Sequence, residues 1–158
     1  MTLALAVWIG GIVFFAFVVA PVAFGQLEPW LAGRIVRGSL LRLHEIGIVC
    51  GVVFLGLLPL AAGPSARRRW PQAGLVAAML LLTGISQFGV IPRMDRLRAR
   101  MDAAGGAAVN TPARARFDRL HRWSVDLEAS VLVLGLILIY FHATSAALPA
   151  ASAESLLP

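Results

Sequence analysis

Four long apolar segments constrain this chain more than any other feature of its sequence. They cover residues 3–24, 46–62, 73–91 and 131–141, and the last extends back to residue 123 if its polar side chains are included. Each approaches the ~20 residues that an α-helix needs to cross the roughly 30 Å hydrocarbon core of a bilayer. Backbone amides must find hydrogen-bond partners inside lipid, so segments of this kind fold as helices. The sequence therefore predicts an all-α integral membrane protein with a four-transmembrane-helix bundle.

The composition leaves little room for anything else. Hydrophobic residues make up 59% of the 158-residue chain and charged residues only 14%, whereas soluble domains carry about 25% charged residues. The mean hydropathy is +0.81. We predict a single transmembrane domain over residues 1–158 that ends in a flexible tail at 144–158. The expected spans are residues 3–25, 44–62, 72–92 and 122–143.

The arginines predict the orientation of the bundle. All fourteen basic residues are arginine, and eleven of them fall between the first and second spans or between the third and fourth. The positive-inside bias then places loops 26–43 and 93–121 in the cytoplasm and both termini outside, in a bacterial inner membrane. This topology and contact with anionic lipid headgroups account for the net charge of +6, so no nucleic-acid partner is expected.

The long third connection has helical character. Residues 93–102 are good helix formers, the glycine pair at 105–106 ends this helix, and Thr111 followed by Pro112 starts the next. We expect spans three and four to extend into the cytoplasm as a helical hairpin. A basic unstructured loop is the competing interpretation.

The tripeptide Arg-Leu-His occurs at residues 42–44 and again at residues 119–121, each time just before an apolar segment. With two helices per unit, this indicates two parallel helical-hairpin repeats related by an axis along the membrane normal. Alignment of the histidines places Gly47 opposite Ser124 and Gly51 opposite Glu128, so the first half has small residues where the second has polar ones. A chance match of three residues is the alternative.

Polar side chains of the second copy continue into the fourth span. His121, Ser124 and Glu128 share one stripe of a helix, and Gln87 lies at a matching depth on the third span. A carboxylate carried into lipid is costly unless it is hydrogen-bonded or protonated. We predict a polar intramembrane site centred on His121 and Glu128, with His44 as a contributor. The competing explanation is an interfacial histidine bonded to a neighbouring helix or to a headgroup.

Small residues predict close contacts between helices. Gly10 and Gly11 lie in the first span, Gly47 and Gly51 form a Gly-x-x-x-Gly pair in the second, and Pro21 is expected to bend the first helix. Close packing between helices is a sufficient explanation for these residues, and no further role is needed.

Metal or haem binding stays open at this point. His44, His121 and Glu128 form a nitrogen and oxygen ligand set if the second and fourth spans meet, and two histidines could equally ligate a haem. The single Cys50 has no partner for a disulfide. No cofactor is strongly implied.

Two groups of residues resemble a known family. They are Trp8-Ile9-Gly10-Gly11 with Phe14, Phe15 and Pro21 in the first span, and Phe117, Leu120, His121, Ser124 and Glu128 at the last. This pattern resembles the transmembrane-protein-205-like family, catalogued in bacteria as domain of unknown function 4149. The resemblance implies a four-helix membrane protein without an assigned reaction, in a family whose eukaryotic branch is linked to platinum-drug resistance. Such proteins tend to have asparagine where this chain has Glu128. A fainter similarity is to copper-resistance D-type membrane proteins.

Three functions are compatible with these features. The small size and the glycine-rich helix faces favour a non-catalytic subunit of a larger membrane complex, or a homo-oligomer. The first alternative is a transporter or metal (copper-like) homeostasis protein that uses His121 and Glu128, and the second is a haem-binding membrane redox protein. An enzyme is not expected, because no nucleophile elbow, phosphate-binding loop or paired-cysteine motif occurs.

Overall fold

The computed structural model describes residues 1–60, 70–103 and 112–154, and these ranges contain four long helices. All four are long and apolar enough to cross a membrane. The first long helix comprises α1 (Thr2–Phe14), the π-helical turn η1 (Phe15–Val19) and α2 (Ala20–Gln26), and the second is α3 (Pro29–Leu57). The third comprises α4 (Trp70–Gly84), the π-helical turn η3 (Ile85–Val90) and α5 (Ile91–Ala103), and the fourth is α6 (Pro112–Glu154). The chain is an all-α integral membrane protein, as predicted.

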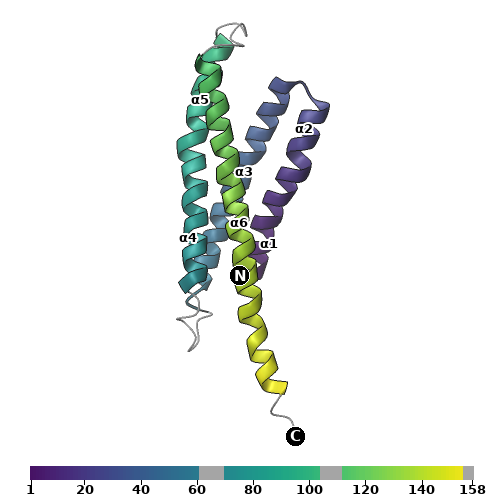
Figure 1. The fold of residues 1–158 in the computed structure, drawn as a ribbon, viewed down its shortest axis with the longest axis vertical. Helices are drawn as coiled ribbons and strands as arrows, with labels where there is room; N and C mark the ends of the chain where they lie inside the picture. Colours follow the sequence, from purple (N-terminus) through teal and green to yellow (C-terminus); the bar gives the residue numbers. More distant parts are fainter. Residues whose placement is uncertain (61–69, 104–111, 155–158) are drawn as a thin grey trace.

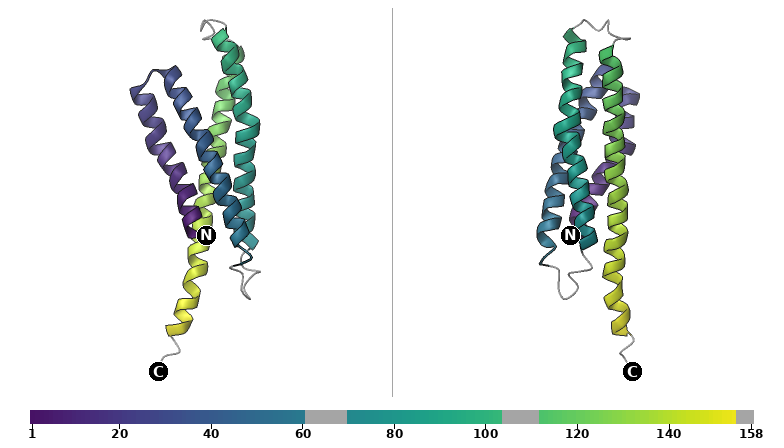
Figure 2. Two further views of the ribbon diagram at one scale, coloured as in Figure 1. Left: turned by 180° about the vertical axis from the view of Figure 1, so that it is seen from behind. Right: turned by 60° about the vertical axis from the view of Figure 1, so that its left-hand side comes forward.

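The helices alternate in direction along the bundle (Figure 1). The N-terminus, the end of α3 and the start of α4 lie at one end, while the α2–α3 turn, the end of α5 and the start of α6 lie at the other. We call this second end the arginine-rich end, because the helical segments there carry Arg34, Arg37, Arg93, Arg96, Arg98, Arg100, Arg114 and Arg116. Towards it, the pair formed by α2 and α3 diverges from the pair formed by α5 and α6 (Figure 2).

The first connection differs from the sequence prediction. Helix α2 ends at Gln26 and α3 already begins at Pro29, so most of the expected loop 26–43 is helix. Proline suits the first position of a helix, because the N–H that it lacks would have no partner inside the helix. The arginines of this segment therefore project from a rigid helix that continues into the second span.

The expected helical hairpin at the other connection is present. Helix α5 continues to Ala103 and α6 begins at Pro112. The predicted stop at residues 105–106 and the cap at Thr111 lie outside the described residues. At the far end α6 continues to Glu154, so the backbone of the expected tail is helical over residues 144–154.

Both interrupted helices change geometry just before a proline. Turn η1 precedes Pro21, and η3 precedes Pro92. Proline cannot donate a backbone hydrogen bond and its ring crowds the carbonyl four residues earlier, so the preceding turn widens. The first and third of the four long helices share this feature.

The packed core lies away from the arginine-rich end. Buried side chains from α1, α3, α4 and α6 meet there, and they include Leu5, Trp8, Ile12, Phe54, Val76, Met79, Val131 and Leu138. Trp8 fills the space over two glycines of α3: a Cβ atom at Gly51 would lie 2.9 Å from Trp8 Cζ3, and one at Gly47 would overlap the indole nitrogen. The absence of side chains at these two positions is what admits the indole.

Two other glycines are equally close to neighbours. A Cβ at Gly11 would lie 2.9 Å from Leu43 Cδ1, and one at Gly135 would lie 2.7 Å from Ile9 Cδ1. The sequence does not single out Gly135. A Cβ at Gly10 would meet no atom of a neighbouring residue within 4 Å, so Gly10 plays no part in these contacts.

We expect Gly47→Ala to destabilise the bundle, because its methyl group would collide with the buried indole of Trp8. Overpacking of this kind costs about 1–3 kcal/mol. The measurement is the thermal unfolding midpoint in detergent, with Gly10→Ala as the matched control in open space. Equal midpoints for the two variants would contradict this explanation of the core.

Candidate functional site

The imidazole of His44 joins three of the four long helices. Its side chain, on α3, is only 2% exposed. Nδ1 lies 2.9 Å from Gln87 Oε1 in η3, and Nε2 lies 3.0 Å from Glu128 Oε2 in α6. Both ring nitrogens are thus engaged by side chains from other helices. We call Gln87, His44 and Glu128 the polar triad.

The π-helical turn positions Gln87. An additional residue in a turn displaces the following side chains around the helix axis, so a regular period of 3.6 residues does not give the direction of Gln87. Its neighbour Ser86 is also buried, and Ser86 Oγ has no hydrogen-bond partner among the described residues. Turns of this kind occur frequently at functional sites.

The protons assigned to the triad follow from the orientation of the Gln87 amide, whose oxygen faces Nδ1 of His44. The carbonyl oxygen of Gln87 accepts a hydrogen bond, so Nδ1 of His44 carries a proton and donates. The contact between Nε2 and Glu128 needs one more proton, which belongs either to an imidazolium facing a carboxylate or to a carboxylic acid facing a neutral ring. Both forms are neutral in sum. Loss of that proton would place a carboxylate against a lone pair within the bundle, which is costly.

A cleft of about 1040 Å³ opens beside the triad, between α2 and α3 on one side and α5 and α6 on the other. Along α6 its lining runs from Arg114 to Glu128, about 21 Å at 1.5 Å per residue. Glu128 is the lining residue of α6 farthest from the arginine-rich end, and its side chain is 15% exposed. The carboxyl group that bonds to His44 therefore also borders the cleft.

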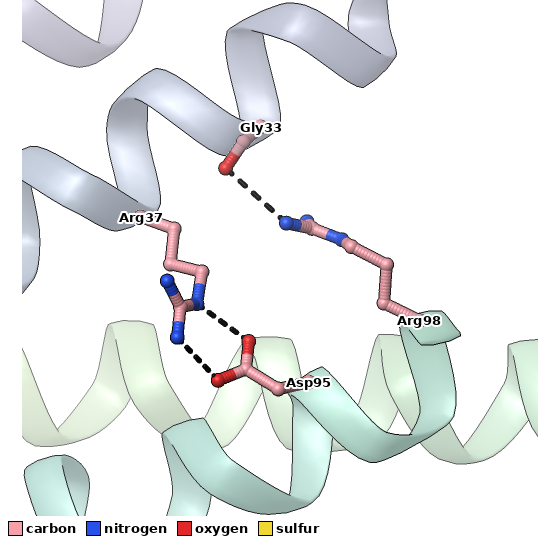
Figure 3. Close-up of polar contacts among 4 residues, drawn as sticks. All are labelled: Gly33, Arg37, Asp95 and Arg98. Atoms are coloured by element: carbon pink, nitrogen blue, oxygen red, sulfur yellow. Dashed lines mark hydrogen bonds and ion pairs between the residues drawn. The ribbon is translucent and has the colours of Figure 1, made fainter. Parts of the chain in front are cut away.

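Arginine side chains bridge the diverging helices. Arg37 of α3 donates from Nε and Nη2 to the two carboxylate oxygens of Asp95 in α5, each over 2.5 Å (Figure 3). Arg98 Nη1 reaches the carbonyl of Gly33 over 3.5 Å, and its guanidinium lies 5.4 Å from the ring centre of Phe117 in α6. The walls of the cleft are thus held at a set separation by long side chains rather than by close packing.

The structure places the predicted site residues in two groups. Gln87, His44 and Glu128 meet, whereas His121 is exposed and its ring stacks on Phe117 with centres 6.4 Å apart and planes 4° apart. Ser124 is buried and borders the cleft. His121 also lines the cleft, seven residues before Glu128, whereas the buried hydrogen bonds centre on His44. The histidine expected only as a contributor holds the central position.

A helical stripe could have identified His44. The buried residues of α3 include His44, Gly47, Gly51 and Phe54, spaced three or four residues apart on one face. A histidine that shares its face with two packing glycines points into the bundle. The tripeptide repeat obscured this, because it makes the two histidines look equivalent.

The expected metal ligands are not assembled. Among the residues that the structure describes, no three histidine, cysteine or acidic side chains are close enough to hold a metal ion. His44 has both nitrogens hydrogen-bonded, so neither is available for haem iron in this arrangement. His142, at the other end of α6, contacts Thr2 over 3.1 Å and lies in edge contact with Phe54.

The fold and the site define a small polytopic membrane protein with a polar triad inside its helix bundle. Residues 3–103, more than half of the chain, match the family described as domain of unknown function (DUF4149), and the chain belongs to this family. The matched region contains His44 and Gln87 and ends before Glu128. Searches of curated proteins and of solved structures give no match.

We expect His44→Phe to destabilise the protein, because it removes the partner of both Gln87 and Glu128 while keeping an aromatic ring. Each buried polar group left without a partner costs about 1–3 kcal/mol. His121→Phe is the matched control, since that ring is exposed. Thermal unfolding in detergent measures the difference, and an equal loss in both variants would show that the triad does not support the fold.

Proposed function

We propose that this protein is a proton-responsive binding or transport protein whose ligand occupies the cleft. The observation that carries the proposal is the position of Glu128, which is hydrogen-bonded to buried His44 and also borders the cleft. A carboxyl group that served only to connect helices would not need this access. Because Glu128 contacts His44 and also borders the cleft, a change in its protonation affects the triad and the inner end of the cleft together.

The mechanism follows from the charge of the pair. With the shared proton in place, the inner end of the cleft is neutral and suits an apolar group. When the proton leaves, a full negative charge develops there and the Nε2–Oε2 hydrogen bond between α3 and α6 is lost. An apolar group beside Glu128 is then disfavoured, because burial of an unpaired charge is costly. Release of the proton therefore favours release of the ligand.

The orientation predicted from the arginines determines which side of the membrane the cleft faces. We propose that the arginine-rich end faces the cytoplasm of a bacterial inner membrane and that both termini lie outside. The cleft then faces the cytoplasmic leaflet, and the triad lies inside the bilayer. Protons would exchange with Glu128 through the cleft, since this is the route along which its side chain is exposed.

The other interpretations receive less support from the geometry. A role as a non-catalytic subunit or as a homo-oligomer stays a prediction from the sequence. Metal homeostasis through His121 and Glu128 lacks an assembled ligand set among the described residues. Haem ligation would require His44 to give up one of its two hydrogen bonds. We propose binding rather than catalysis, because the sequence contains none of the nucleophile or phosphate-binding motifs named above.

A fluorescent probe on the cleft wall tests the proposal. Bimane attached at Val125→Cys, in a Cys50→Ala background, would lie in the cleft three residues before Glu128. With His121→Phe included in both proteins, because His121 lines the cleft beside the probe, we expect the emission in phosphatidylcholine nanodiscs to change with pH, and Glu128→Gln to abolish the change.

The matched control carries the probe at Val133→Cys, which is exposed on the same helix and outside the cleft lining. It should not respond to pH. A titration that persists in Glu128→Gln, or that is the same at both probe positions, would refute the proposal.

A further inference from the structure

The two ends of the cleft differ in chemistry. Towards its inner end the lining is mostly apolar, with Phe15, Leu40, Ile91 and Val125, and its polar residues there are Ser124 and Glu128. Towards the arginine-rich end guanidinium groups and aromatic rings line it instead, among them Arg34, Arg98, Trp30 and Phe117. A molecule that fits both ends must itself be amphipathic.

The charges at the arginine-rich end leave two guanidinium groups for a ligand. Four arginines border the cleft; Arg37 pairs with Asp95, and Arg114 pairs with Asp118 over 3.2 Å. The other two, Arg34 and Arg98, have no ion pair with a carboxylate among the described residues. Within the same described part of the chain, Asp102 is the remaining acidic lining residue without an ion pair, so the balance at this end stays positive.

Arg98 is oriented for a ligand on its free side. One amino group reaches Gly33 O and the planar group lies over Phe117, as Figure 3 shows for the contact with Gly33. A guanidinium has five N–H donors, so most of them stay available. Guanidinium groups match phosphate oxygens with paired hydrogen bonds. Such a phosphate would lie between the diverging helix pairs.

The length of the cleft fits a lipid in one leaflet. Its lining extends about 21 Å along α6, and half of a bilayer hydrocarbon core is roughly 15 Å thick. A headgroup at the arginine-rich end therefore allows an acyl chain to reach the inner end. The neutral His44–Glu128 pair would then contact the end of that chain.

We infer that the cleft binds one anionic phospholipid, with its phosphate at Arg34 and Arg98 and an acyl chain along the apolar wall towards Glu128. This inference rests on the proposed function and names its ligand class. The lipid is held by charge at one end and by apolar contact at the other. Release of the shared proton weakens only the second of these.

Native mass spectrometry can test the inference with the full chain. Protein is exchanged into detergent that contains equal amounts of phosphatidylglycerol and phosphatidylcholine, and retained lipid is counted. We expect wild type to retain one phosphatidylglycerol in preference to phosphatidylcholine. The double variant Arg34→Gln with Arg98→Gln should lower phosphatidylglycerol retention about tenfold, since two charges near an anionic headgroup are lost. Phosphatidylcholine retention should not change.

The matched control is Arg96→Gln with Arg100→Gln, which removes two exposed arginines of α5, the helix that carries Arg98. Neither of these two arginines lines the cleft. It should retain phosphatidylglycerol as wild type does. Because Arg98 also contacts Gly33 and Phe117, Arg34→Gln alone provides a second variant, and we expect it to lose about threefold to fivefold. Equal retention of both lipids by wild type, or an equal loss in the control, would overturn the inference.

This experiment is independent of the pH test. If the titration is observed but the lipid is not selected, the ligand class is wrong and the proton-responsive function stands. If the lipid is selected but no titration occurs, the cleft is a lipid site without proton control.

Discussion

The hydrogen bonds of His44 are the constraint on which the rest of this structure depends. They connect α3 to η3 and α6, and they lie between a tightly packed half of the bundle and a half that opens into the cleft. Inside a membrane, apolar burial does little to hold helices together, because lipid is as apolar as the side chains. Polar contacts and close packing of small residues take that role. The triad supplies the first, and Gly47 and Gly51 against Trp8 supply the second.

The same arrangement explains why the arginine-rich half can stay open. Its helices diverge, and the bidentate contact of Arg37 with Asp95 together with the contacts of Arg98 holds them at a distance (Figure 3). The Arg37 and Asp95 side chains are 40% and 33% exposed, so solvent partly screens this bidentate pair. Long side chains therefore connect the walls of the cleft, whereas close packing and the triad hold the other half together. Glu128 lies at the boundary between these two regions, where the proposed proton exchange would take place.

Much of the fold could be predicted from the sequence, because bilayer thickness sets the length of an apolar helix and arginine sets its ends. The helical extension through Ala103 followed from local helix propensity. The early start of α3 at Pro29 did not, since a basic segment between two spans is typical of a loop. The triad was only partly predictable. Depth along the helices pairs Gln87 with Glu128, but the choice of His44 over His121 depends on which helix face is buried, and the direction of Gln87 depends on a π-helical turn.

Solid-state nitrogen-15 NMR of the His44 imidazole, in bilayers, tests most directly whether it shares a proton with Glu128. In wild type we predict a protonated Nδ1 and an Nε2 signal typical of a strong hydrogen bond to a carboxyl group. In Glu128→Gln the Nδ1 signal should stay and the Nε2 signal should move to that of an ordinary neutral imidazole. Identical Nε2 signals in the two proteins, or an Nδ1 without a proton in wild type, would contradict the shared proton.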